Sequence, residues 1–155
     1  MARTIEGGMD AKGLKVALIV ARWHEQVTSK LLDGALDALA KHGASSDDLT
    51  IVRVPGSWEI HLAAAKLAAA GRHDAIVALG CLIRGETPHF DYLAAETAAG
   101  LARAGASSGI PVIFGVLTCE TLEQALSRAG GKGGNKGWDA AAAAIEMVSV
   151  YRRLG

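Results

Sequence analysis

The stretch "DAIVALGCLIRGETPH", residues 74–89, carries the pattern on which the fold prediction rests. Residues 75–83 are apolar without alternation, which is typical of a strand buried on both faces of a parallel sheet. Arg84 and Gly85 end this run, and the pair Thr87-Pro88 then signals a helix with Thr87 as the N-cap. The stretch therefore predicts a buried strand, a polar turn and a helix, in that order.

The same order of elements recurs along the rest of the chain. We expect strands at residues 14–20, 50–54, 74–83 and 110–118. Helices are expected in the segments 28–43, 57–71, 88–104, 121–131 and 135–154, with a capping box at Thr121 and Gln124 and an N-cap at Asn135. Apolar strands that alternate with helices predict an α/β fold, in which helices cover both faces of a four-stranded parallel sheet.

Length and composition exclude several classes of protein. The 155 residues suit one domain, and because half are hydrophobic but only 5% aromatic, the core should be aliphatic. The 16 positive and 16 negative residues argue against nucleic acid or a membrane as a partner recognised through net charge. No apolar run approaches the roughly 20 residues of a membrane span, and residues 1–13 lack a signal-peptide core. Cys81 and Cys119 are expected to be buried free thiols, as in the cytoplasm.

Ligands of such sheets bind at the carboxyl ends of the strands, so we examined the segments that follow each strand. After the third strand, the backbone N–H groups of Gly85, Glu86 and Thr87 precede a helix and suit an anion. His89 lies in the first helical turn, where the helix dipole favours the neutral ring and a bound phosphate favours the protonated one. Such a histidine can exchange a proton near pH 7. An ordinary surface histidine after a capped turn is the alternative.

Other candidate residues are less specific. Trp23 follows the first strand and could stack on a flat heterocycle or simply cover the rim of the sheet. Glu59 could bind a ligand or only complement a helix dipole. Arg128 shortly precedes the glycine-rich stretch "GGKGGNKG" (130–137), and Lys136 lies inside it; each could meet a phosphate or be a solvated charge. His24 is left open, and no role is assigned to the remaining histidines, His42, His61 and His73.

Four motifs in this order together resemble the lumazine synthase family of riboflavin biosynthesis. They are "VPGSWEI" (54–60), "GCLIRGETPHFDY" (80–92), "FGVLT" (114–118) and "EQALSRAGGKGGNKGWDAAAAAIEM" (123–147). The resemblance implies a flavodoxin-like three-layer sandwich that needs neither metal nor organic cofactor. It also implies a reaction that joins 5-amino-6-(D-ribitylamino)uracil to 3,4-dihydroxy-2-butanone 4-phosphate, with 6,7-dimethyl-8-ribityllumazine, phosphate and water as products.

The resemblance assigns roles to individual residues. It makes His89 the proton-transfer group, Trp23 the ring that stacks on the pyrimidine, and Ser57 and Glu59 contacts of the ribityl chain. Further contacts of the pyrimidine substrate are expected at Trp58, Cys81, Leu82, Ile83, Phe114 and Lys136, and contacts of the phosphate at Gly85, Glu86, Thr87 and Arg128. Of these, the neighbouring subunit supplies Phe114, Arg128 and Lys136. The chain departs from the usual pattern at His24, commonly Asn, and at His61, commonly Pro.

The resemblance also implies a homo-oligomer. We expect a pentamer, and because the turn at 130–137 has the short form, we expect pentamers to pack into an icosahedral shell. Riboflavin synthase, which acts in the same pathway, is a candidate partner. Two other classes remain open: a protein that binds a flavin or lumazine without turnover, and a shell protein with vestigial chemistry. A flavodoxin proper is disfavoured, because its phosphate loop follows the first strand, where this chain has "ARWHEQ" (21–26).

Overall fold

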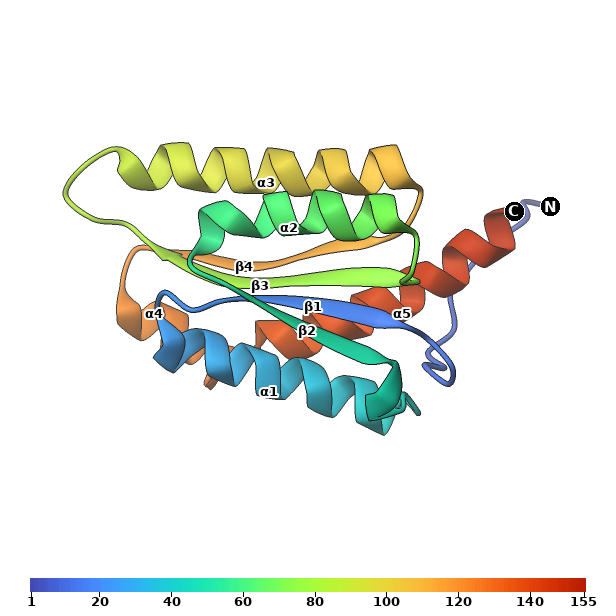
Figure 1. Ribbon diagram of the computed structural model, residues 1–155. Coiled ribbons are helices and arrows are strands. Elements are labelled where there is room, and N and C mark those ends of the chain that lie inside the picture. The colour runs from blue at the N-terminus through green and yellow to red at the C-terminus, as the bar shows by residue number, and fades with distance from the viewer.

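The computed structural model describes residues 1–155 and shows a four-stranded parallel sheet between two layers of helices (Figure 1). The strands are β1 (Val16–Ala21), β2 (Leu49–Val54), β3 (Ala75–Ile83) and β4 (Val112–Cys119). The helices are α1 (Glu25–Lys41), α2 (Ser57–Ala70), α3 (His89–Ser108), α4 (Leu122–Ser127) and α5 (Lys136–Leu154), and a 3-10 turn, η1 (Ser46–Asp48), precedes β2. The strand order is β2-β1-β3-β4. The predicted flavodoxin-like α/β architecture is confirmed.

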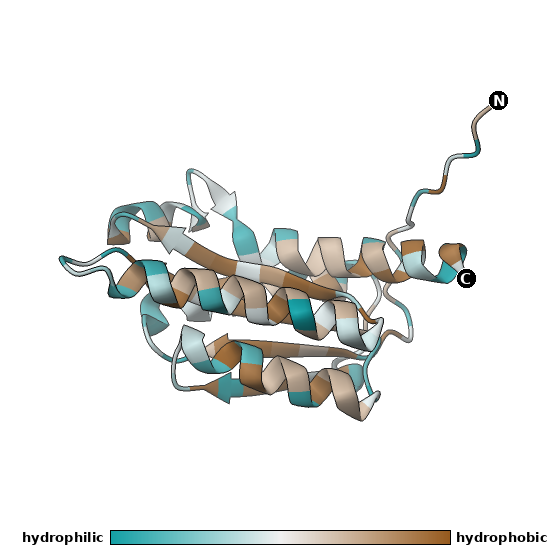
Figure 2. Ribbon diagram, turned by 90° about the horizontal axis from the view of Figure 1, so that it is seen from above, coloured by the Kyte–Doolittle hydropathy of each residue, from teal (hydrophilic) through white to brown (hydrophobic).

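Two apolar clusters hold the layers together. Helices α1 and α5 cover one face of the sheet, and α2 and α3 cover the other (Figure 1). The central strands β1 and β3 are buried on both faces, which explains their unbroken apolar sequences. Figure 2 shows hydrophobic colour concentrated in the strands beneath the helices. The edge strands β2 and β4 are partly exposed. None of the helices has the length and apolar character that crossing a bilayer requires.

Two helix starts differ from the sequence prediction. Thr87 is not the N-cap of α3: the helix begins at His89, its N-cap is Pro88, and no side chain caps it. The prediction was wrong because the fixed φ of proline, here −71°, suits the cap position as well as the first helical position. Helix α1 begins earlier than expected, since His24 adopts the left-handed conformation and its carbonyl accepts hydrogen bonds from Val27 and Thr28 at 2.9 and 3.0 Å.

The predicted caps of the last two helices are confirmed. The Thr121 hydroxyl accepts a hydrogen bond from the Gln124 N–H at 3.2 Å, and the Gln124 side chain accepts one in return from the Thr121 N–H at 3.3 Å. The Asn135 side chain accepts from the Trp138 N–H at 3.0 Å and donates to the Lys30 carbonyl at 3.0 Å. Asn135 thereby ties the start of α5 to α1.

The glycine-rich stretch between α4 and α5 forms more structure than a plain turn. Its two ends pair as short antiparallel strands, β5 (Ala129–Gly131) and β6 (Gly134–Asn135). The Lys136 N–H donates to the Arg128 carbonyl at 2.8 Å, so the two cationic residues flank the same ribbon. At Gly137 the helices α1 and α5 approach so closely that a Cβ atom would collide with the Leu31 carbonyl oxygen. Glycine is therefore required there, and it fixes where Lys136 lies.

Candidate functional site

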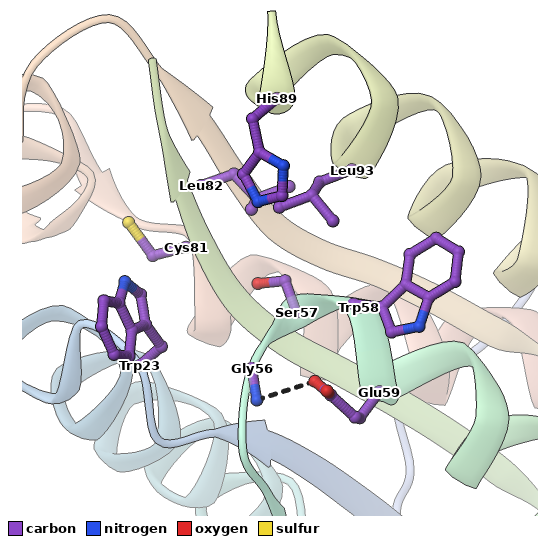
Figure 3. A pocket seen from close by; sticks show the side chains of 9 residues that line it. All are labelled: Trp23, Gly56, Ser57, Trp58, Glu59, Cys81, Leu82, His89 and Leu93. Atoms are coloured by element: carbon purple, nitrogen blue, oxygen red, sulfur yellow. Dashed lines mark hydrogen bonds between the residues drawn. The ribbon is translucent and has the colours of Figure 1, made fainter. Parts of the chain in front are cut away.

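A cavity of about 540 Å³ opens at the carboxyl ends of the strands, where the fold class predicts a ligand. Figure 3 shows its lining residues, which come from the end of β1, the start of α2, the end of β3 and the start of α3: Trp23, Gly56, Ser57, Trp58, Glu59, Cys81, Leu82, His89 and Leu93. We call it the first cavity. Seven of the predicted site residues meet here although they come from four separate segments of the chain.

The start of α2 supplies the polar wall of this cavity. The Glu59 carboxylate accepts a hydrogen bond from the Gly56 N–H at 3.1 Å, which orients the carboxylate at the helix start (Figure 3). The Ser57 hydroxyl is buried and has no hydrogen-bond partner within the protein. A buried hydroxyl without a partner is costly, so a hydroxyl-bearing ligand that reached Ser57 would satisfy it. This wall suits a polyol chain.

Trp23 supplies the opposite, aromatic wall. Its side chain is 70% exposed, and its only close aromatic contact is an edge-on one to His24, with ring centroids 6.1 Å apart. The indole face is therefore available to stack on a flat heterocycle. Because the backbone N–H of Trp23 donates to the Pro55 carbonyl at 3.0 Å, the ring is anchored beside the start of α2.

A smaller hollow of about 270 Å³ adjoins the first cavity and shares Trp23, Leu82, His89 and Leu93 with it; its other lining residues are His24, Ile83, Gly85, Thr87 and Phe90. We call it the turn-side hollow. The backbone N–H groups of Gly85, Glu86 and Thr87 donate to no backbone carbonyl. These unpaired donors lie just before α3, where the helix dipole also favours an anion. His89 thus borders both the space for a heterocycle and the turn that could bind a phosphate.

His24 is a lining residue to which the sequence analysis gave no role. It is the only non-glycine residue with a positive φ, at 61°. Partial burial lowers its pKa below the ordinary value for histidine, so the ring in this hollow is neutral near pH 7. The departure from the asparagine common at this position was the available signal, because asparagine adopts the left-handed conformation readily.

Two cationic site residues lie elsewhere. A second cavity, of about 340 Å³, is lined by Phe114, Val116, Leu117, Thr118, Arg128 and Lys136. It contains all three residues that the resemblance assigns to a neighbouring subunit, and none of them lines the first cavity. An Arg128 Nη atom donates to the Cys119 sulfur at 3.7 Å, which holds the guanidinium against the end of β4.

The surroundings of Cys81, Cys119 and His61 indicate structural roles for these residues and not catalytic ones. Cys81 and Cys119 are buried and unbridged, as predicted. Burial, with a smaller contribution from Cys119, raises the pKa of Cys81 from 9.0 to about 12, so this cavity residue is a neutral thiol rather than a nucleophile. His61, to which no role was assigned, is half-buried between Trp58, at 5.1 Å between ring centroids, and Gly100.

The combined geometry accommodates a stacked ring at Trp23, a hydroxylated chain at Ser57 and Glu59, an anion at residues 85–87 and proton exchange at His89. The family model for 6,7-dimethyl-8-ribityllumazine synthase matches residues 13–152, nearly the whole chain. The match includes every residue that lines the three hollows described above. The chain therefore belongs to the 6,7-dimethyl-8-ribityllumazine synthase family, a family of enzymes of riboflavin biosynthesis.

Proposed function

We propose that the chain condenses 5-amino-6-(D-ribitylamino)uracil with 3,4-dihydroxy-2-butanone 4-phosphate to give 6,7-dimethyl-8-ribityllumazine, phosphate and water. The observation that carries the proposal is the position of His89, which lines both the first cavity and the turn-side hollow. One imidazole then adjoins the pyrimidine amine and the phosphate ester at the same time. A protein that only binds lumazine has less need of a proton donor at this junction.

In this proposal the pyrimidine stacks on Trp23 and its ribityl chain extends along Ser57 and Glu59. The unpaired Ser57 hydroxyl and the oriented Glu59 carboxylate are suitable partners for ribityl hydroxyls. Four further residues, Trp58, Cys81, Leu82 and Ile83, form walls around the two rings of the product. The phosphate of the second substrate binds the free N–H groups of Gly85, Glu86 and Thr87.

The chemistry requires proton transfers at fixed positions. The pyrimidine amine attacks the ketone, and loss of water gives an imine. Elimination of phosphate, attack of the second nitrogen on the remaining carbonyl and loss of a second water then close the ring. His89 takes the proton that the amine loses and returns one to a departing oxygen. Binding both reactants in one cavity also accelerates the reaction, because the translational and rotational entropy of bringing them together is lost on binding and not in the chemical step.

We further propose that each complete site lies between two subunits. The first and second cavities of one chain are separate, so Phe114, Arg128 and Lys136 would act at the first cavity of a neighbour. An interface that joins different surfaces of identical chains forms a closed ring when its rotation closes, and the ring proposed here is a pentamer. The short turn at 130–137 supports further packing of pentamers into an icosahedral shell. Native mass measurement distinguishes a shell, a free pentamer and a monomer, and a monomer would exclude the shared site.

The decisive experiment mixes the purified protein with both substrates and follows lumazine absorbance together with phosphate release. We expect one phosphate per lumazine. Tight binding of lumazine without turnover would favour the binding protein over the enzyme. An assembled shell that neither binds nor converts the substrates would instead indicate a structural protein.

A further inference from the structure

Arg84 is the first residue of the turn before α3, and its guanidinium donates hydrogen bonds to two carboxylates of the same chain. Its Nη1 and Nη2 atoms donate to the two carboxylate oxygens of Asp91 at 3.3 and 3.0 Å. Its Nε donates to Glu120 at 3.2 Å, and the guanidinium carbon lies 4.6 Å from the centre of the Phe90 ring. Hydrogen bonds to Asp91 and Glu120 raise the pKa of Arg84 above its ordinary value, so the charge persists at any working pH.

These contacts join the turn, α3 and the segment after β4, and the first two of these line the turn-side hollow. Asp91 lies in the first turn of α3, two residues after His89, and Glu120 directly follows β4. The backbone N–H of Arg84 adds a fourth contact, to the Cys119 carbonyl at 2.9 Å. Arg84 lines neither the first cavity nor the turn-side hollow, so its charge is directed to the two carboxylates rather than to a ligand.

Few other hydrogen bonds fix the turn at residues 85–87, which follows Arg84. Residues 85–87 neither donate nor accept a backbone–backbone hydrogen bond, and the next such bond runs from the Asp91 N–H to the Pro88 carbonyl at 3.0 Å. An exposed ion pair contributes little to global stability. A bidentate arginine–carboxylate pair nevertheless restricts geometry, because two parallel hydrogen bonds fix the relative orientation of the groups.

We propose that Arg84 is a positioning residue that holds the turn 85–87 and His89 in the arrangement that binds phosphate, by tying the turn to α3 and to the end of β4. The inference rests on the proposed function for the identity of the phosphate-bearing substrate. It does not require turnover, since inorganic phosphate can report on the same turn.

The experiment compares Arg84→Met with Asp91→Asn and Glu120→Gln, which remove the partners and leave the arginine in place. Lys41→Met is the matched control, because Lys41 and Asp37 form an exposed ion pair at 3.0 Å on α1, away from the site. The measurements are the KM of each substrate, kcat, and the affinity for inorganic phosphate. Circular dichroism melting checks that each variant folds.

We expect Arg84→Met to raise the KM of the butanone phosphate and to lower the affinity for inorganic phosphate on the order of tenfold, because small displacements of binding groups have large effects. The KM of the pyrimidine should change by less than about twofold, because Trp23 and α2 are untouched. Asp91→Asn should reproduce much of this effect, and Arg84→Lys should fall between wild type and Arg84→Met. Arg84→Met combined with Asp91→Asn should be no worse than Arg84→Met alone.

Three results would overturn the inference. Arg84→Met could match the Lys41→Met control in phosphate affinity. Arg84→Met could lower the affinity for phosphate while Asp91→Asn and Glu120→Gln leave that affinity unchanged. This would mean that Arg84 contacts the phosphate directly. The effects of Arg84→Met and Asp91→Asn could be additive. A wild-type protein that binds phosphate but forms no lumazine would remove the proposed function only, and the phosphate affinities of the variants would still decide the role of Arg84.

Discussion

The first and second cavities of this chain differ in the kind of chemistry that each can support. The first cavity and its turn-side hollow contain an exposed indole, a carboxylate, a histidine and unpaired backbone N–H groups, but no lysine or arginine. The second cavity contains Phe114 and two cations, Arg128 and Lys136, but no histidine or carboxylate. In the proposed reaction, the first set of groups serves proton transfer and the second adds positive charge for the phosphate.

The difference follows from the strands and helices that contribute residues to each cavity. β4 is an edge strand in the order β2-β1-β3-β4, and the second cavity is lined by its residues and by Arg128 and Lys136, which flank the ribbon after α4. The residues of the first cavity cluster at the carboxyl ends of β1 and β3 instead. In the proposed oligomer, the second cavity of a neighbouring chain completes the first cavity.

Replacing His89 tests the first cavity and should have the largest effect. Because His89 is the group placed to move protons, His89→Ala should lower kcat by roughly 10²–10⁴-fold with a smaller change in either KM. Steady-state kinetics with both substrates measures this. His73→Ala, before the start of β3 at the far end of the sheet, is the control. A His89→Ala enzyme within about twofold of wild type would contradict the assignment.

Mixing two inactive variants tests whether the cavities of neighbours combine. If chains with His89→Ala and chains with Arg128→Ala are unfolded together and reassembled in equal amounts, about one quarter of the interfaces should pair an intact His89 with an intact Arg128. Activity at low butanone phosphate should then recover well above that of either variant. Mixing without reassembly is the control. An absence of recovery in reassembled rings would place both residues in the same chain's site.

Replacing Arg128 tests the second cavity alone. Arg128→Ala should raise the KM of the butanone phosphate by roughly 10–100-fold, because a charge-assisted hydrogen bond to phosphate is lost. The KM of the pyrimidine should change little. Lys132→Ala removes an exposed cation from the same ribbon and serves as control. If only the pyrimidine KM rose, the phosphate role of Arg128 would be wrong.

Tryptophan fluorescence tests whether the pyrimidine substrate stacks on Trp23. Binding of the pyrimidine substrate should quench part of the emission, and Trp23→Ala should abolish that part, because a heterocycle stacked on the indole face quenches the excited ring by direct contact. Trp138, which packs on His42 with ring centroids 5.8 Å apart, is the distant reference. Trp58 cannot serve as one, since it lines the same cavity. Quenching that persists unchanged in Trp23→Ala would place the ring elsewhere.

The smallest expected effect concerns the thiol in the first cavity. Burial raises the pKa of Cys81 from its ordinary value of 9.0 to about 12 in the folded chain. The unfolded chain therefore releases this proton first as the pH rises, so stability is complete below pH 9 and is lost progressively towards pH 12. The loss attributable to Cys81 should reach about 1 kcal/mol by pH 10. Denaturant unfolding at pH 7 and pH 10 measures it, and Cys81→Ala should show a correspondingly smaller difference.

Local patterns predicted the elements of the fold because those patterns reflect contacts between near neighbours in the chain. The apolar run at 75–83 and the capping pair Thr121 and Gln124 were both found as expected. The start of α3 was misplaced by one residue, since proline is compatible with two adjacent positions. The place of His24 in the turn-side hollow depends on its left-handed backbone and on strand order, which no short window of sequence contains.

The sequence by itself determined the α/β class, the four strands and the set of candidate site residues, because hydrophobic periodicity, caps and motifs are written in consecutive residues. Only the tertiary structure decided which of those residues meet. The pairing of Arg84 with Glu120, 36 residues away, and the separation of Arg128 from His89 both follow from the strand order and the connections that produce it. Side chains distant in the chain come together only where parallel strands end side by side, and that arrangement is a property of the whole sheet.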